Sequence, residues 1–282
     1  MIDASAIADP PFRAALAAVD AGDVRALDAL LAAHPELVRD RLEQGEGYFR
    51  RPYLLWFVAE NPVRTGRLPA NVAEVARTIL RAAERGRVGS LGEQRDYALS
   101  LVCSGRVPRE CGVQRELLDL LVDAGADPNA ALVPALAHRE LAAAGRLLER
   151  GATLTLLAAA CTGRTADVAR LAPGASAAER EAALVGAAFH GRAAPVAALL
   201  ALGADPSAFG APGFHDHATA LHHAVDSKSL DVVAALADAG ASLDVKDRIY
   251  GATPLGWAEY LGHAEIAEYL RARAGGPTAA AE

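Results

Sequence analysis

One ending recurs four times in this chain and restricts its fold more than any other feature. In each copy an apolar helical pattern stops at a Gly-Ala pair, which a short polar or apolar pair follows. Glycine is the usual residue at a left-handed helix end, where a Cβ would be costly. Such recurrence predicts a stack of repeated units. The copies read LLVDAGADPN at 120–129, LLERGATL at 147–154, LLALGADPS at 199–207 and ALADAGASLD at 235–244.

Paired helical patterns precede these endings. Small and apolar residues recur there at spacings of three and four, and a short glycine turn divides each pair. The composition agrees, because hydrophobic residues make up 52% of the chain and aromatic residues only 5%, with alanine and leucine supplying most of the apolar content. Such a composition favours closely packed helices, so the predicted fold class is all-α. The turns lie at Gly22, Gly163, Gly191 and Gly262.

The last two units carry a more specific signature. Thr219-Ala220-Leu221-His222 and Thr253-Pro254-Leu255-Gly256 lie about 34 residues apart, and Ala224 and Ala258 follow them. Both stretches resemble the ankyrin repeat, which opens on Thr-Pro-Leu-His, has a small helical residue after it and repeats about every 33 residues. The resemblance implies a solenoid of roughly eight stacked helix-turn-helix units with short hairpin loops.

The resemblance extends over nearly the whole chain, with its clearest motifs in the C-terminal third. We therefore predict one ankyrin solenoid over 1–275, with divergent N-terminal repeats at 1–118, more regular repeats at 119–275, and a flexible tail at 276–282. The divergent part contains a segment like a capping repeat at 15–38 and a second repeat at 51–85 with an inserted loop at 62–70.

Charge and segment patterns exclude several classes of function. The formal net charge is −7, so no overall positive field would attract a nucleic acid. No signal peptide is visible, and no run of about 18 apolar residues occurs without a charge or a helix breaker. Three cysteines without metal-type spacing favour reduced thiols. We expect a soluble, cytoplasmic, monomeric protein, and the excess of arginine and alanine suggests a bacterial source.

Histidines cluster in the loop and helix around residues 213–223. The imidazoles of His215, His217, His222 and His223 and the carboxylate of Asp216 are zinc-type ligands, but their spacing does not guarantee convergence. The resemblance gives His222 the position of the Thr-Pro-Leu-His histidine, which supports the turn by hydrogen bonding. We therefore predict a structural role for His222 and no metal site.

The resemblance also implies where a partner would bind. Ankyrin proteins grip partners with their hairpin tips and the exposed side of the first helix, on a concave surface. The predicted function is thus a protein- or peptide-binding module. Aromatic residues are favoured anchors at interfaces, which singles out Phe189, Tyr250 and Tyr260. The predicted contact residues are Phe189, His190, His215, Asp216, His223, Asp226, Ile249, Tyr250, Glu259 and Tyr260.

Two other functions remain open. A small-molecule-binding protein or unusual enzyme would use a pocket in the concave groove near His215, His223, Asp226 and Glu259, where two carboxylates could serve acid–base chemistry. No nucleophile elbow, P-loop or dinucleotide motif is present, so no catalytic residue and no cofactor are predicted. An acidic mimic of nucleic acid would need its acids gathered on one face.

An aromatic patch allows two interpretations of its own. Five of the fourteen Phe, Trp and Tyr residues lie within ten positions, beside the inserted loop. They form either a local core that replaces missing repeat contacts or the lining of a groove for an extended ligand. The patch consists of Tyr48, Phe49, Tyr53, Trp56 and Phe57.

Overall fold

The computed structural model describes residues 7–275, which divide into two compact units, one up to residue 153 and one from residue 154. The described residues form helices joined by turns and loops, with no strand among them and one isolated bridge between Phe209 and Thr219. The prediction of an all-α fold is confirmed. The single domain over 1–275 stays a prediction, and the predicted tail at 276–282 lies outside the described residues.

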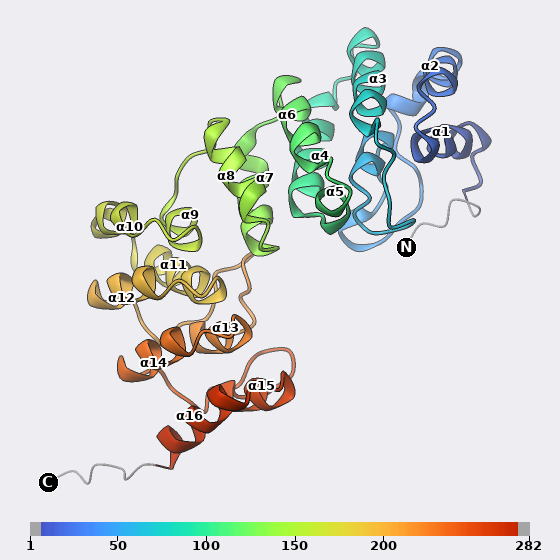
Figure 1. The fold of residues 1–282 in the computed structure, drawn as a ribbon. Helices are drawn as coiled ribbons and strands as arrows, with labels where there is room; N and C mark the ends of the chain where they lie inside the picture. The colour runs from blue at the N-terminus through green and yellow to red at the C-terminus, as the bar shows by residue number, and fades with distance from the viewer. Residues whose placement is uncertain (1–6, 276–282) are drawn as a thin grey trace, which may run out of the picture. The chain divides into compact units, whose positions relative to one another are not determined.

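The first unit contains four helix pairs (Figure 1). The first members of successive pairs pack against one another, and so do the second members, which gives two layers. Shorter helices fill the connections: η2 (Pro35–Val38), η3 (Gly47–Phe49) and α5 (Arg106–Glu110). The pairs are α1 (Pro10–Ala21) with α2 (Val24–Ala33), the 3₁₀ helix η4 (Leu54–Ala59) with α3 (Val72–Arg85), α4 (Leu91–Ser104) with α6 (Gln114–Asp123), and α7 (Pro128–Ala137) with α8 (Leu141–Glu149).

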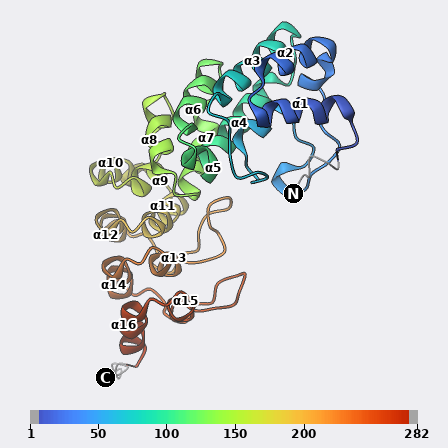
Figure 2. The same cartoon turned by 45° about the vertical axis from the view of Figure 1, so that its right-hand side comes forward.

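The second unit repeats this plan with four further pairs, so the predicted count of about eight is confirmed. Helices α9, α11, α13 and α15 form one layer and α10, α12, α14 and α16 the other. Figure 2 shows the loops before α13 and α15 reaching past these helices, on the side away from α14 and α16. The pairs are α9 (Leu156–Cys161) with α10 (Thr165–Leu171) and the short η5 (Ala172–Gly174), α11 (Ala177–Phe189) with α12 (Ala193–Ala201), α13 (Ala220–Asp226) with α14 (Leu230–Asp238), and α15 (Pro254–Tyr260) with α16 (Ala264–Ala274).

Two glycines lie where a Cβ atom would be too close to a neighbouring side chain. Gly22 ends α1 with φ of 68°, and a Cβ there would lie 2.3 Å from the side-chain oxygen of Asn71. Gly186 has ordinary helical geometry, but a Cβ on it would lie 2.6 Å from Leu157 and 2.7 Å from Cys161. The first glycine thus permits a left-handed turn, and the second lets α11 approach α9 closely.

The aromatic patch is a local core. Phe49, Tyr53, Trp56 and Phe57 are all buried, and the rings of Phe49 and Phe57 meet edge to face at 5.2 Å. The indole nitrogen of Trp56 donates a hydrogen bond to the carbonyl of Gln94 (3.2 Å). Buried and paired in this way, the rings fill the space beside the short helix η4. The interpretation as a local core is confirmed for these four residues, while Tyr48 is exposed.

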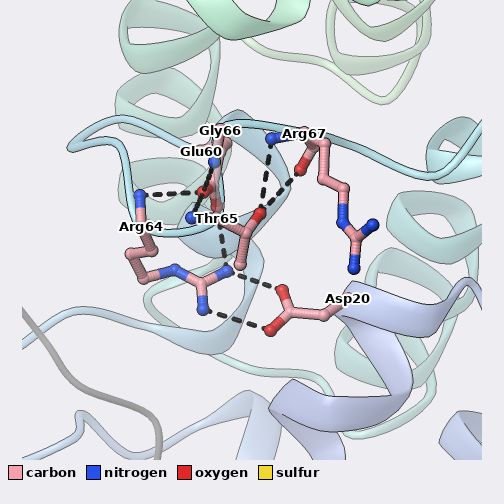
Figure 3. Close-up of polar contacts among 6 residues, drawn as sticks. All are labelled: Asp20, Glu60, Arg64, Thr65, Gly66 and Arg67. Atoms are coloured by element: carbon pink, nitrogen blue, oxygen red, sulfur yellow. Dashed lines mark hydrogen bonds and ion pairs between the residues drawn. The ribbon is translucent and has the colours of Figure 1, made fainter.

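A buried carboxylate holds the inserted loop at 62–70 (Figure 3). Glu60 is only 2% exposed, and its Oε1 accepts hydrogen bonds from the backbone amides of Arg64 (2.8 Å), Thr65 and Gly66 (3.0 Å). Its Oε2 accepts from the Arg64 guanidinium (3.0 Å), which also donates two hydrogen bonds to Asp20 of α1 (2.6 and 3.2 Å). The network fixes the loop to both η4 and α1.

Candidate functional site

The loop before α15 is organised by one aspartate. The carboxylate of Asp247 accepts hydrogen bonds from the backbone amides of Ile249 (2.9 Å), Tyr250 (2.6 Å) and Ala252 (2.9 Å), and from the indole nitrogen of Trp257 (3.0 Å). Burial opposes the charge, but these four donors outweigh it and lower the pKa of Asp247 well below its ordinary value. Asp247 therefore fixes both the loop and the Trp257 ring.

His222 connects two successive repeats. Its Nε2–H donates to the carbonyl of Ala252 (3.0 Å), while Nδ1 lies 2.8 Å from the Thr219 hydroxyl and accepts from the Thr219 amide (3.3 Å). Burial lowers the pKa of His222, because the doubly protonated, charged ring is unfavourable away from water. The hydrogen bond to the Ala252 carbonyl acts in the opposite direction, since it favours the charged ring. The histidine is fully buried, as a structural role requires.

The structural role of His222 predicts that its removal destabilises the second unit. We expect His222→Ala to lower the free energy of unfolding of the second unit by about 2 kcal/mol, because it leaves the Thr219 and Ala252 groups without partners. Thermal unfolding followed by circular dichroism measures the loss. His263→Ala is the control, since His263 is the residue before α16 and its ring makes none of the hydrogen bonds found in the described residues. Equal losses from the two variants would contradict the structural role.

Three further histidines form an aromatic cluster with Phe189: His215 and His217 belong to the loop at 207–218, and His223 lies on α13. The ring of His215 lies 4.1 Å from that of Phe189 and 5.3 Å from that of His223, and the ring of His217 lies 5.5 Å from that of His223. Burial lowers the pKa of His223 to about 3, helped by the neighbouring histidines. Among residues 7–275 no three His, Cys, Asp or Glu side chains are placed to hold a metal ion.

A groove opens between the ends of α13 and α15. It has a volume of about 460 Å³ and is mainly lined by aromatic and apolar side chains. Tyr250 is 77% exposed and Tyr260 is 90% exposed, whereas Trp257 is half-buried. One acidic residue, Asp226, lies at its edge, where α13 ends. The lining residues are Asp226, Tyr250, Ala252, Gly256, Trp257, Tyr260 and Leu261.

The structure places the predicted contact residues in different surroundings. Asp226, Tyr250 and Tyr260 line the groove, and the exposed Ile249 and Asp216 lie on the two loops beside it. His190 and His215 are half-buried. Phe189 and His223 are 6% and 2% exposed, because the loop carrying Phe214 and His215 folds over them; neither offers a surface to a partner, and we remove both from the proposed contacts.

Glu259 lies apart from the groove. It forms an ion pair with Arg271 of α16 (2.6 Å) and lines a separate hollow together with residues of that helix. Asp226 and Glu259, whose carboxylates could have shared an acid–base site, therefore do not line the same cavity. Nor is His223 open to one, because it is buried. The arrangement gives no support to the enzyme or small-molecule alternative in the form predicted.

Sequence reasoning missed Trp257 and Asp247. A signal existed for the first, because Trp257 and Tyr260 are three positions apart on one helix and so share a face. For Asp247 the signal is weaker: an aspartate a few residues before a glycine commonly accepts hydrogen bonds from its own turn. Its bond to Trp257 joins a loop to a helix, and no local pattern predicts that.

Comparison with known proteins agrees with this geometry. Residues 184–277, about a third of the chain, match a family model described as ankyrin repeats in three copies. The chain is an ankyrin-repeat protein. Parts of it are similar to human cyclin-dependent kinase inhibitor 2A, with 48% identity over 56 residues, and to bovine cyclin-dependent kinase 4 inhibitor B, with 44% identity over 86 residues.

These similarities are local. The first alignment covers 20% of this ankyrin-repeat protein and 35% of the human inhibitor, and the second covers 29% and 60% of the bovine one. The family model and these relatives support the repeat family that the sequence predicted, and the helices of the structure agree with it. A bacterial source stays a prediction. No helix within residues 7–275 has the length and apolar character needed to cross a membrane.

Proposed function

We propose that this ankyrin-repeat protein is a protein-interaction module and that its contact surface is formed by the last two repeats. The observation that carries the proposal is the gathering of exposed large side chains around the groove: Ile249, Tyr250 and Tyr260 are 62%, 77% and 90% exposed. Water-exposed aromatic residues beside a hollow are typical of interfaces rather than of a surface that stays free.

The same region has a fixed frame, which favours binding. Asp247 and His222 hold the loop at 241–252 against α13 and α15 through hydrogen bonds of 2.6–3.0 Å. A surface held in one conformation loses less entropy when a partner binds. We propose the concave side of these repeats as the contact face, and a cytoplasmic, monomeric state stays a prediction with it.

A protein kinase is the first partner class to test. Both relatives are named as inhibitors of cyclin-dependent kinases. Kinase binding by this chain is a proposal that follows from those names. Purified cyclin-dependent kinases therefore belong in the binding assay beside a whole-cell lysate.

Exposed aromatic residues should decide whether a partner is captured. We expect Tyr250→Ser with Tyr260→Ser to reduce capture from lysate at least about tenfold, because anchor residues at an interface commonly contribute more than 1 kcal/mol each. Immobilised protein and quantitative mass spectrometry measure the captured amount, and circular dichroism checks that the helices remain.

Two exposed apolar residues of other repeats provide the control. Val133 on α7 and Leu202 after α12 are 39% and 40% exposed, and both change to serine in the matched variant. That variant should capture as much partner as the wild type. If capture falls equally in both variants, or in neither, the last two repeats are not the contact surface.

A further inference from the structure

We propose that the groove between α13 and α15 is an arginine-binding site, which takes one arginine side chain of the partner. This inference rests on the proposed function and adds the chemistry of the residue that the groove accepts. The side chains that would contact the arginine are Asp226, Tyr250, Trp257 and Tyr260.

Aromatic rings give the groove its affinity for a flat cation. Three of its seven lining residues are Tyr or Trp, and a guanidinium over such a ring is attracted by the electrons of the ring face. The Trp257 ring is already fixed: its nitrogen donates to Asp247 (3.0 Å), and the His222 ring packs against it at 5.1 Å. One wall is therefore in place before the partner binds.

The charge of the region selects a cation. Asp226 is the one acidic residue among those lining the groove. It ends α13, and Tyr260, which ends α15, also lines the groove, so the partially negative C-terminal ends of both helices lie beside it. Between residues 205 and 275 the sequence has ten Asp and Glu residues but five Lys and Arg residues. A phosphate or a carboxylate would be repelled from such a surface.

Three of those five cations are already engaged. Arg248 donates to the carbonyl of Asp216 (2.8 Å) and covers the Phe209 ring, Arg271 pairs with Glu259 (2.6 Å), and Arg273 pairs with Asp238. No Lys or Arg is among the described residues that line the groove, and acidic residues outnumber basic ones two to one over 205–275. An incoming basic side chain meets an acidic region of the protein.

Arginine fits better than lysine. Its planar guanidinium stacks on aromatic faces, pairs with a carboxylate through two parallel hydrogen bonds, and is more weakly hydrated than an ammonium group. An apolar side chain would use the rings equally well, but it would bring no positive charge to this acidic region. The groove with three rings and one carboxylate therefore matches arginine.

The test uses capped pentapeptides of four alanines around a central arginine, lysine or citrulline. Citrulline has nearly the shape of arginine without its charge. Protein labelled with ¹⁵N-tryptophan gives two indole signals, because the chain has two tryptophans, one in each unit. We expect the arginine peptide to shift the Trp257 signal and leave the Trp56 signal unmoved. The citrulline peptide should bind about tenfold more weakly and the lysine peptide several-fold more weakly.

Two variants, each of which removes one carboxylate, test whether Asp226 is the group that attracts the arginine. Asp226→Asn should weaken the arginine peptide about threefold to tenfold, whereas Glu259→Gln, which removes a neighbouring charge outside the groove, should change its affinity less than twofold. Equal binding of arginine and citrulline, an unmoved Trp257 signal, or equal effects of the two variants would overturn the arginine site.

The two proposals fail separately. If Tyr250→Ser with Tyr260→Ser abolishes partner capture but Asp226→Asn leaves it intact, the contact surface stands and the arginine site is overturned. If the arginine peptide binds as expected but neither variant alters capture, the groove has the proposed chemistry and the interaction surface lies elsewhere, which overturns the proposed function.

Discussion

Glu60→Gln should lower the free energy of unfolding of the first unit by about 3 kcal/mol, because breaking a buried ionic network from one side leaves the partner groups unpaired. Glu60 accepts hydrogen bonds from three backbone amides and from one guanidinium. Glutamine keeps only one acceptor oxygen, so its N–H group must face some of these donors. For a domain of this size the loss corresponds to about 6–12 °C in Tm.

The single tryptophan of each unit makes this loss measurable. In a Trp257→Phe background the fluorescence of Trp56 reports the first unit alone, and urea unfolding gives the free energy. Hydrogen exchange provides a local readout, since the amides of Thr65 and Gly66 then face a neutral amide group in place of the carboxylate and should exchange faster.

An exposed glutamate in the same unit is the control. Glu43 pairs with Arg51, but its side chain is 72% exposed. Exposed ion pairs contribute little, so Glu43→Gln should change the free energy by less than about 0.5 kcal/mol. If both variants cost the same, the carboxylate of Glu60 does not hold the insert, and the loop at 62–70 must be stabilised by its packing.

The sequence alone predicts the structure of the repeats better than that of the inserted loop at 62–70. Repeats announce themselves, because each must bury one apolar face against the next and so carries the same spacing of Leu and Ala. The second repeat departs from this rule: its first helix is the short 3₁₀ helix η4, and Glu60, the residue directly after it, has φ of 47°. Glu60 bonds to Arg64, which in turn bonds to Asp20 of α1, and no periodic pattern connects these three residues.

Within the candidate site, alignment to the ankyrin repeat predicted the place of a residue along the repeat better than its burial. It placed Tyr250 and Tyr260 on the exposed side, where the structure also has them. It also placed Phe189 and His223 there, yet both are covered by the long loop at 207–218. A loop's path depends on long-range contacts such as Arg248 with the Asp216 carbonyl, and these lie beyond the reach of a repeat motif.

The second large effect is expected from Asp247→Asn. Asparagine keeps one oxygen acceptor but turns an N–H group toward donors that the second carboxylate oxygen now satisfies, namely the Ala252 amide and the Trp257 indole. Hydrogen bonds to a charged acceptor contribute about 1.5–3 kcal/mol each. We expect a loss of about 3 kcal/mol in the second unit, measured through Trp257 fluorescence in a Trp56→Phe background.

The loss should depend on pH in a definite direction. The folded-state pKa of Asp247 lies below its ordinary value of about 4, so ionised Asp247 stabilises the folded protein fully above about pH 4. Its contribution is lost as the pH falls toward the folded-state pKa. The difference in unfolding free energy between wild type and Asp247→Asn should therefore be constant from about pH 7 to 5 and shrink below about pH 4.

The buried histidines affect wild type and Asp247→Asn alike, so they do not alter the pH dependence of the difference between the two proteins. His222 and His223 also have lowered pKa values, so both proteins lose stability as the pH falls below about 6.5, where unfolded histidine takes up a proton. Wild type and variant share that slope, and it largely cancels in the difference. A difference that begins to shrink near pH 6 instead of below 4 would assign the effect to the histidines.

A second aspartate of the same loop separates hydrogen bonding from charge. Asp244 is exposed and accepts a hydrogen bond from the Ser242 hydroxyl, so Asp244→Asn removes the same charge and should cost less than about 0.5 kcal/mol. Because Asp247 positions Trp257 without lining the groove, Asp247→Asn should also weaken the arginine peptide, while Asp244→Asn should not. Normal peptide binding by a destabilised Asp247→Asn protein would show that the Trp257 wall does not depend on this carboxylate.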